Sequence, residues 1–190
     1  MAQKEELYTL LGKYQELSNV HPKRNQLANE EATEFFIWQC NGLEGSSLKL
    51  EDVRDVLTSG VNNVTESNRE ELEVVGLYEA MQYANRLVAE NKELTEEDVK
   101  KIHNLLYVGA SVEFKGQYRT DFITIPHARN LPPVRHISYF MNQLFEKYQF
   151  MQDLDIIERV ALFHLEFEEN TKYLEENPLE VVGEILIVAG

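Results

Sequence analysis

The stretch Gly116-Gln117-Tyr118-Arg119-Thr120-Asp121-Phe122-Ile123-Thr124-Ile125 is where the helical periodicity of the chain changes to another pattern. Aromatic and β-branched residues follow one another from Phe122 to Ile125, and such residues are enriched in strands. We therefore expect an extended, hairpin-like segment between residues 109 and 133. Apart from the ambiguous run from Leu179 to Val188, it holds the only strands that the sequence predicts.

Helical spacing dominates on both sides of this segment. Apolar residues recur every three or four positions, which is typical of amphipathic helices, and His21-Pro22 interrupts the first run. The apolar run from Leu179 to Val188 is compatible with either a helix or a strand. The sequence thus predicts a mainly α fold. Its expected helices cover residues 5–17, 24–40, 48–57, 67–88, 95–107, 134–150 and 156–169.

Three helix starts carry cap signals. The spacing Ser67-x-x-Glu70 has the form of a capping box, in which the serine and the glutamate satisfy backbone N–H groups reciprocally. Thr95, followed by three acidic residues, repeats the signal. Asp153 or Asp155 is expected to cap the helix that begins near residue 156.

The composition limits the classes of function. A length of 190 residues with 43% hydrophobic residues is enough for one domain with a continuous core. The formal charge of -15 disfavours nucleic acid and anionic membrane surfaces as partners. The histidines are scattered without metal-site spacing, so no metal ligand is predicted. A single cysteine, no signal-peptide pattern and no membrane-spanning apolar run predict a cytoplasmic protein.

Two further motifs lie far from the strand-like segment. They are Cys40-Asn41-Gly42-Leu43-Glu44-Gly45 and Leu162-Phe163-His164-Leu165-Glu166-Phe167-Glu168. Together with that segment and Leu131-Pro132-Pro133, they resemble the Fic family of AMP-transferring enzymes over residues 33–168. The resemblance implies a helical bundle with a small β-hairpin flap. It also implies an N-terminal helical region over residues 1–60, which carries an inhibitory-motif-like helix, and a Fic-like core over residues 61–190.

The first motif resembles the inhibitory motif of the family, Ser/Thr-x-x-x-Glu-Gly/Asn, with Cys40 in place of the hydroxyl residue. In the family, the glutamate pairs with an arginine of the catalytic signature and blocks placement of the ATP γ-phosphate. Carboxylate and phosphate compete for one guanidinium because both form charge-assisted pairs with it. The resemblance therefore implies that Glu44 and Gly45 are inhibitory residues.

The strand-like segment resembles the flap with which Fic enzymes pair target segments by strand addition. An exposed strand edge offers backbone donors and acceptors, so recognition depends little on side chains. The partner implied is thus a protein target. The residues implied to bind it are Gly116, Tyr118, Arg119, Phe122, Ile123 and Thr124.

The catalytic signature of the family, His-Pro-Phe-x-Asp/Glu-Gly-Asn-Gly-Arg-x-x-Arg, is not recognisable after Glu168. The family mechanism needs a histidine base, an acidic residue for Mg²⁺, and a glycine-rich nest with two arginines for ATP. Past Glu168 the sequence has no histidine or arginine, and Lys172 is its only cation. We expect His164 to be a packed scaffold residue. No catalytic residue is assigned, and binding of the family's ATP and Mg²⁺ is left open.

Three hypotheses follow. The first is a Fic-like domain that has lost AMP transfer and keeps a protein-binding or regulatory role. The second is an active adenylyltransferase represented here by a truncated or altered form. The third is a helical interaction protein that forms homo-oligomers through the run from Leu179 to Val188.

Overall fold

The computed structural model describes residues 2–59, 68–108, 115–118 and 136–171, and these are helical over most of their length. The mainly α prediction is confirmed. The predicted hairpin segment, between residues 109 and 133, lies outside the described ranges except for residues 115–118. The elements are α1 (Ala2–Val20), α2 (Pro22–Leu43), α3 (Leu50–Ser59), α4 (Arg69–Ala89), α5 (Glu96–Leu106), α6 (Ile137–Phe150), the short 3₁₀ helix η3 (Met151–Asp153) and α7 (Ile156–Thr171).

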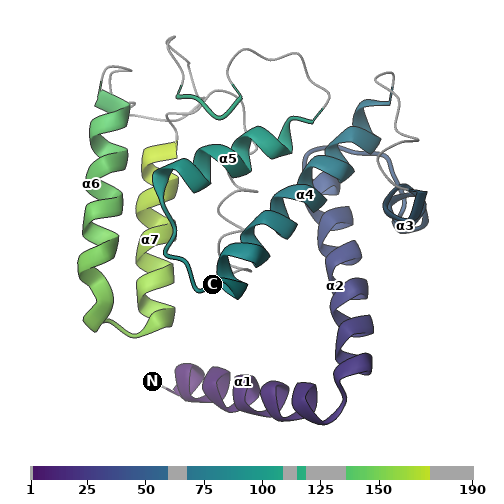
Figure 1. Ribbon diagram of the computed structural model, residues 1–190, viewed down its shortest axis with the longest axis horizontal. Helices are drawn as coiled ribbons and strands as arrows, with labels where there is room; N and C mark the ends of the chain where they lie inside the picture. The colour runs from purple at the N-terminus through teal and green to yellow at the C-terminus, as the bar shows by residue number, and fades with distance from the viewer. Residues whose placement is uncertain (1, 60–67, 109–114, 119–135, 172–190) are drawn as a thin grey trace.

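The helices form a bundle around α4 and α5 (Figure 1). On one side, α2 and α3 pack against α4. On the other side, α6 and α7 lie side by side as a helical hairpin joined through η3. Helix α1 runs at a steep angle to α2 along the lower edge of the view, towards the α6–α7 pair. No helix among the described residues is both long enough and apolar enough to span a lipid bilayer.

The crossing of α4 over α5 depends on a glycine. Gly76 lies in the buried middle of α4, and a Cβ atom there would lie 2.5 Å from the carbonyl oxygen of Leu106 and 2.9 Å from that of Leu105. Only a residue without a side chain lets the two backbones approach so closely. The core on both sides of this crossing consists mainly of aliphatic side chains, including Ile37, Val53, Val74, Leu77, Val99, Ile102, Ile137, Met141 and Phe167.

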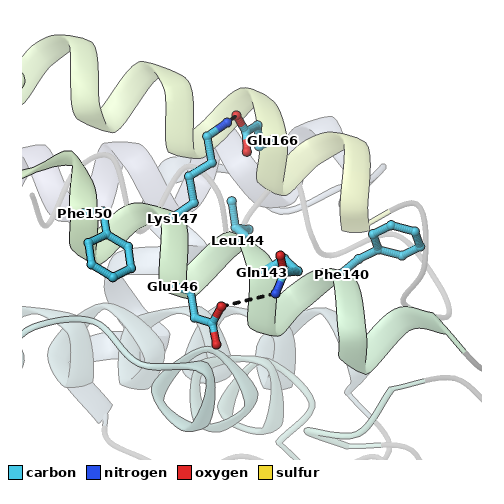
Figure 2. Close-up of a pocket in the computed structure, with 7 residues that line it drawn as sticks. All are labelled: Phe140, Gln143, Leu144, Glu146, Lys147, Phe150 and Glu166. Atoms are coloured by element: carbon cyan, nitrogen blue, oxygen red, sulfur yellow. Dashed lines mark hydrogen bonds and ion pairs between the residues drawn. The ribbon is translucent and has the colours of Figure 1, made fainter.

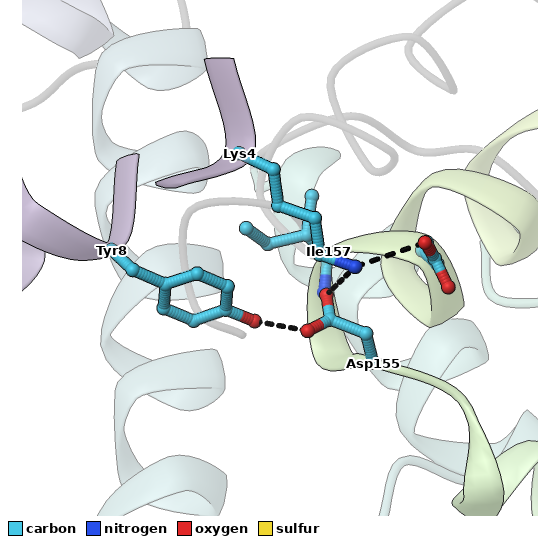
Figure 3. A network of polar contacts seen from close by, with 5 residues as sticks. Lys4, Tyr8, Asp155 and Ile157 are labelled. Atoms are coloured by element: carbon cyan, nitrogen blue, oxygen red, sulfur yellow. Dashed lines mark hydrogen bonds and ion pairs between the residues drawn. The ribbon is translucent and has the colours of Figure 1, made fainter. Parts of the chain in front are cut away.

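Helix α1 is joined to the rest of the molecule at both ends. At its C-terminal end the chain bends at His21, and Pro22 occupies the first turn of α2, where a missing N–H costs nothing. At its N-terminal end the Tyr8 hydroxyl donates to Asp155 Oδ2 at 2.5 Å, and Lys4 Nζ lies 3.2 Å from Asp155 Oδ1 (Figure 3). Lys4 also pairs with Glu158 at 2.9 Å. We call these contacts the α1–α7 clip.

Two of the predicted caps are present and one is wrong. Thr95 forms a complete capping box with Asp98 at the start of α5. Asp155 accepts a hydrogen bond from the Ile157 N–H at 3.0 Å at the start of α7. The N-cap of α4 is Asn68 rather than Ser67. The carboxylate of Glu70, expected to complete that capping box, instead accepts hydrogen bonds from the loop that follows α2.

Candidate functional site

The predicted inhibitory pair ends helix α2. Gly45 has a φ of +92°, a left-handed conformation that glycine adopts without strain. The Gly45 N–H donates to the carbonyl oxygen of Gly42 at 3.1 Å, and the Ser46 N–H donates to that of Asn41 at 2.9 Å. These two bonds form a Schellman motif, which satisfies carbonyls that the helix end would otherwise leave open. Gly45 is therefore required by the backbone, and it leaves the Glu44 side chain exposed at the C-cap.

The loop after Glu44 is tied to α4. Glu70 Oε2 accepts hydrogen bonds from Ser46 Oγ at 3.1 Å and from the Ser47 N–H at 3.1 Å, and the Ser47 hydroxyl donates to the same oxygen at 3.0 Å. The Trp38 indole N–H donates to the Leu48 carbonyl at 3.0 Å. Because both ends of the loop are bonded, the position of Glu44 is fixed relative to α4. We call the bonds between Glu70 and the two serines the Glu70 latch.

Cys40 occupies the motif position that carries a hydroxyl group in the family. It is 3% exposed and belongs to the main core cluster. A buried cysteine behaves as a small hydrophobic residue with a weak donor. The thiol therefore contributes packing at the base of the motif.

The first residues of the predicted flap lie against α5. The Gly116 N–H donates to His103 Nδ1 at 2.9 Å. The Lys100 ammonium group lies 4.8 Å from the centre of the Tyr118 ring, and Lys100 is itself paired with Glu96 at 2.8 Å. Burial raises the pKa of the Tyr118 hydroxyl, with Glu96 as a further cause. These contacts join α5 to the first residues of the flap.

The remaining predicted site residues, Arg119, Phe122, Ile123 and Thr124, lie outside the described ranges, so their roles stay predictions. His164 lies on α7 and is half-buried, on the same helix as the buried Phe163 and Phe167. The burial agrees with the predicted scaffold role.

Residues 93–176 match the model of the family described as "Fic/DOC family". This part of the chain is a Fic domain. Among curated relatives, the protein adenylyltransferase fic-1 of Caenorhabditis briggsae is 26% identical over 166 residues, which cover 78% of this chain and 32% of the relative. That of Caenorhabditis elegans is 27% identical over 137 residues, covering 68% of this chain and 26% of the relative.

Solved structures agree with the fold of this Fic domain. A Fic domain containing signaling protein from Bacteroides thetaiotaomicron superposes with a TM-score of 0.79 at 18% identity, over 96% of this chain and 70% of that one. Fic-1 from C. elegans gives a TM-score of 0.71 at 18% identity, over 99% of this chain and 57% of that one. The chain spans about a third or less of the length of the two curated fic-1 relatives.

The family implies ATP and Mg²⁺, and most of the sequence where the resemblance would place them, from residue 172 on, lies outside the described ranges. The positions where the resemblance would place the nucleotide site follow residue 168 in the sequence. There Lys172 is the only cation, and Glu175, Glu176 and Glu180 would repel a triphosphate. In the part of the chain that the structure describes, no group of three His, Cys, Asp or Glu side chains could hold a metal ion.

An open groove lies between α6 and α7 (Figure 2). Within it, Lys147 reaches across to form an ion pair with Glu166, and Gln143 donates to Glu146 at 3.2 Å. Lys147 and Glu166 are thus paired with each other, and none of the predicted site residues within the described ranges lines the groove. The lining residues are Phe140, Gln143, Leu144, Glu146, Lys147, Phe150 and Glu166.

Sequence reasoning missed two residues that position the predicted sites. His103 was read as one of several scattered histidines, although it lies on the same helix face as the buried Val99 and Ile102. Glu70 was read as part of a cap. The sequence signal for His103 was its place on an apolar helix face. No sequence signal indicated the contacts of Glu70, because its partners lie 23 and 24 residues away in the sequence.

Proposed function

We propose that this Fic domain does not transfer AMP and instead binds an extended protein segment through its flap, residues 116–125. One observation carries the proposal. Helix α7, which corresponds to the helix leading into the family's catalytic signature, is followed by a sequence without histidine or arginine. A target hydroxyl would find no histidine base there, and the triphosphate would find no arginine.

Flap binding is supported by the contacts of Gly116 and Tyr118 with α5. Strand addition gains its affinity from backbone hydrogen bonds, so it needs no catalytic group. A segment that begins from a fixed point loses less conformational entropy when a target orders it. Target binding through the flap therefore does not depend on the catalytic residues of the family.

The first test is AMP transfer. The chain is incubated with labelled ATP, Mg²⁺ and a whole-cell protein mixture, with C. elegans fic-1 as a comparison and the variant Glu44→Gly as a second sample. We expect no label on any protein with either form of this chain. Robust label transfer by the unmodified chain would end the proposal.

The second test concerns the flap itself. A photo-crosslinking group is placed at Ile123, and the adducts formed in the same protein mixture are resolved by mass spectrometry. Thr124→Pro removes a backbone donor, whereas Thr124→Val keeps the backbone and changes the side chain only. We expect discrete adducts that persist in Thr124→Val and disappear in Thr124→Pro. Equal adducts in the two variants would contradict strand addition.

A second candidate is an active adenylyltransferase of which this chain is a truncated or altered form. It is favoured by the exposed Glu44 on an ordered helix end and by the relatives, which are described as protein adenylyltransferases. On this hypothesis Glu44→Gly increases label transfer. Sequencing the gene beyond the codon for Glu168 separates the two candidates, because a His-Pro-Phe reading frame there favours the active enzyme.

A homo-oligomer formed through the run from Leu179 to Val188 is the third proposal, and it is compatible with either of the others. The run is apolar and lies outside the described ranges. Light scattering after size exclusion tests it, since a strict monomer at all concentrations contradicts it. We also propose a cytoplasmic location, on the sequence features given above.

A further inference from the structure

We infer that His103 is a positioning residue for the flap, because its ring holds Gly116 against α5 and so fixes the point from which the flap begins. The inference rests on the proposed flap function for its biological meaning. The attachment of Gly116 to the His103 ring can be tested independently of that function.

The first support is the hydrogen bond itself. His103 Nδ1 accepts from the Gly116 N–H at 2.9 Å, and the His103 side chain is 2% exposed. An accepting Nδ1 carries no proton, so this bond assigns the neutral tautomer with the proton on Nε2. Burial lowers the pKa of His103 to about 4, so the ring remains an acceptor throughout the neutral range.

The second support is the conformation of Gly116, which is independent of the histidine. Its φ is +65°, and a Cβ atom there would lie 2.6 Å from the Lys100 carbonyl oxygen and 3.3 Å from Asn104 Cβ. The backbone therefore touches the α5 helix at the one position where the residue has no side chain. Because the backbone lies this close to α5, His103 on that helix is within reach as the acceptor of the Gly116 N–H.

A second contact holds the chain two residues later. Tyr118 lies beneath the Lys100 ammonium group, which Glu96 holds in place through an i,i+4 ion pair. Gly116 and Tyr118 together fix both the position and the direction of the chain as it reaches Arg119. A fixed starting point matters because a shift of one residue in the pairing register of a strand moves its side chains to the opposite face of the sheet. His103 therefore acts on target binding through register, although it lies on α5.

The same geometry argues against a catalytic role for His103. A general base needs an accepting ring nitrogen within reach of the substrate hydroxyl. In His103 the accepting nitrogen is occupied by Gly116, and the ring has almost no exposed surface.

The experiment compares two variants. His103→Asn keeps an acceptor near the position of Nδ1, and His103→Leu keeps similar bulk without an acceptor. Hydrogen exchange of the Gly116 amide is measured by NMR, with amides in the middle of α4 as a control for the fold. We expect exchange at Gly116 to accelerate by about tenfold or more in His103→Leu and to stay near that of the parent chain in His103→Asn. Unchanged protection in His103→Leu overturns the inference, as does equal loss in both variants with α4 protected.

A measurement on the parent chain covers the case in which His103→Leu does not fold. The ring nitrogens are observed by NMR across the neutral range. A constant neutral tautomer, with Nδ1 bare and Nε2 protonated, supports the inference, and a protonated Nδ1 overturns it. Crosslinking at Ile123 then distinguishes a failure of the proposed flap function from a failure of the positioning role of His103. If Gly116 loses protection in His103→Leu while Thr124→Pro leaves the adducts unchanged, the proposed function fails and the positioning role remains.

Discussion

At the scale of single residues, glycines decide where backbones can meet. Gly76→Ala would place a methyl group 2.5 Å from the Leu106 carbonyl oxygen, at a buried crossing of two helices. Because backbone on both sides must shift, we expect a loss of about 1–3 kcal/mol in the free energy of unfolding. Gly12→Ala in α1 has nothing within 4 Å and should gain about 0.5–1 kcal/mol. Urea unfolding measures the change in the free energy of unfolding for both variants. Changes of the same sign would contradict the argument.

A second residue-scale prediction concerns pH. The folded-state pKa of His103 is about 4, below its ordinary value of 6.5, because the ring is buried. Between these values the unfolded chain binds a proton that the folded chain does not, so stability falls as pH falls from 6.5 to about 4. The full contribution is about 3 kcal/mol. Urea unfolding midpoints of the parent chain and of His103→Asn, measured across this pH range, isolate the contribution of His103, because both proteins contain the same carboxylates. If the midpoints of the two proteins change in parallel with pH, the prediction is wrong.

At the scale of elements, the sequence predicted features that depend on neighbouring residues, and it did not predict contacts between residues far apart in the sequence. The break at His21-Pro22, the capping box of Thr95 and the aspartate cap of α7 depend on neighbouring residues, and the sequence predicted them. At the start of α4 the N-cap is Asn68 rather than the predicted Ser67, and Glu70 has partners across the fold in Ser46 and Ser47. The contact of His103 with Gly116 joins residues 13 positions apart in the sequence, which no local pattern encodes.

The Glu70 latch gives the prediction at this scale. Glu70→Ala removes the acceptor of three described donors on the loop that follows Glu44. We expect a loss of about 1–2 kcal/mol in the free energy of unfolding, since hydrogen bonds to charged groups are worth more than neutral ones. Amides of residues 44–49 should exchange faster, while those of α5 stay protected. Glu71→Ala, in the same first turn, controls for the charge at the helix start. A loop as protected as in the parent chain would show that the latch does not hold Glu44 in place.

At the scale of the whole molecule, α1 is an arm that spans from α2 to α7. Leu7, Leu10 and Leu17 on α1 are each more than half exposed, so the arm adds little to the core. Its attachment at the far end is the α1–α7 clip, which is made of ionic and hydroxyl contacts near solvent. Such contacts are weak singly and are screened by salt. The helical core and the arm should therefore respond differently to conditions that weaken ion pairs.

The double variant Lys4→Gln/Tyr8→Phe tests this separation, because it removes the α1 side of the clip and leaves Asp155 to cap α7. We expect the distance between spin labels on Thr9 and Gln152 to broaden, while the unfolding midpoint of the core changes little. Lys13→Gln, on the same helix and outside the clip, should leave the distance unchanged. The Tyr8 hydrogen bond lowers the pKa of Asp155, with Lys4 as a further cause. The carboxylate therefore stays charged as pH falls to its ordinary pKa, and the parent chain should release α1 only below it. A distance distribution in the double variant as narrow as in the parent would show that contacts outside the clip hold the arm.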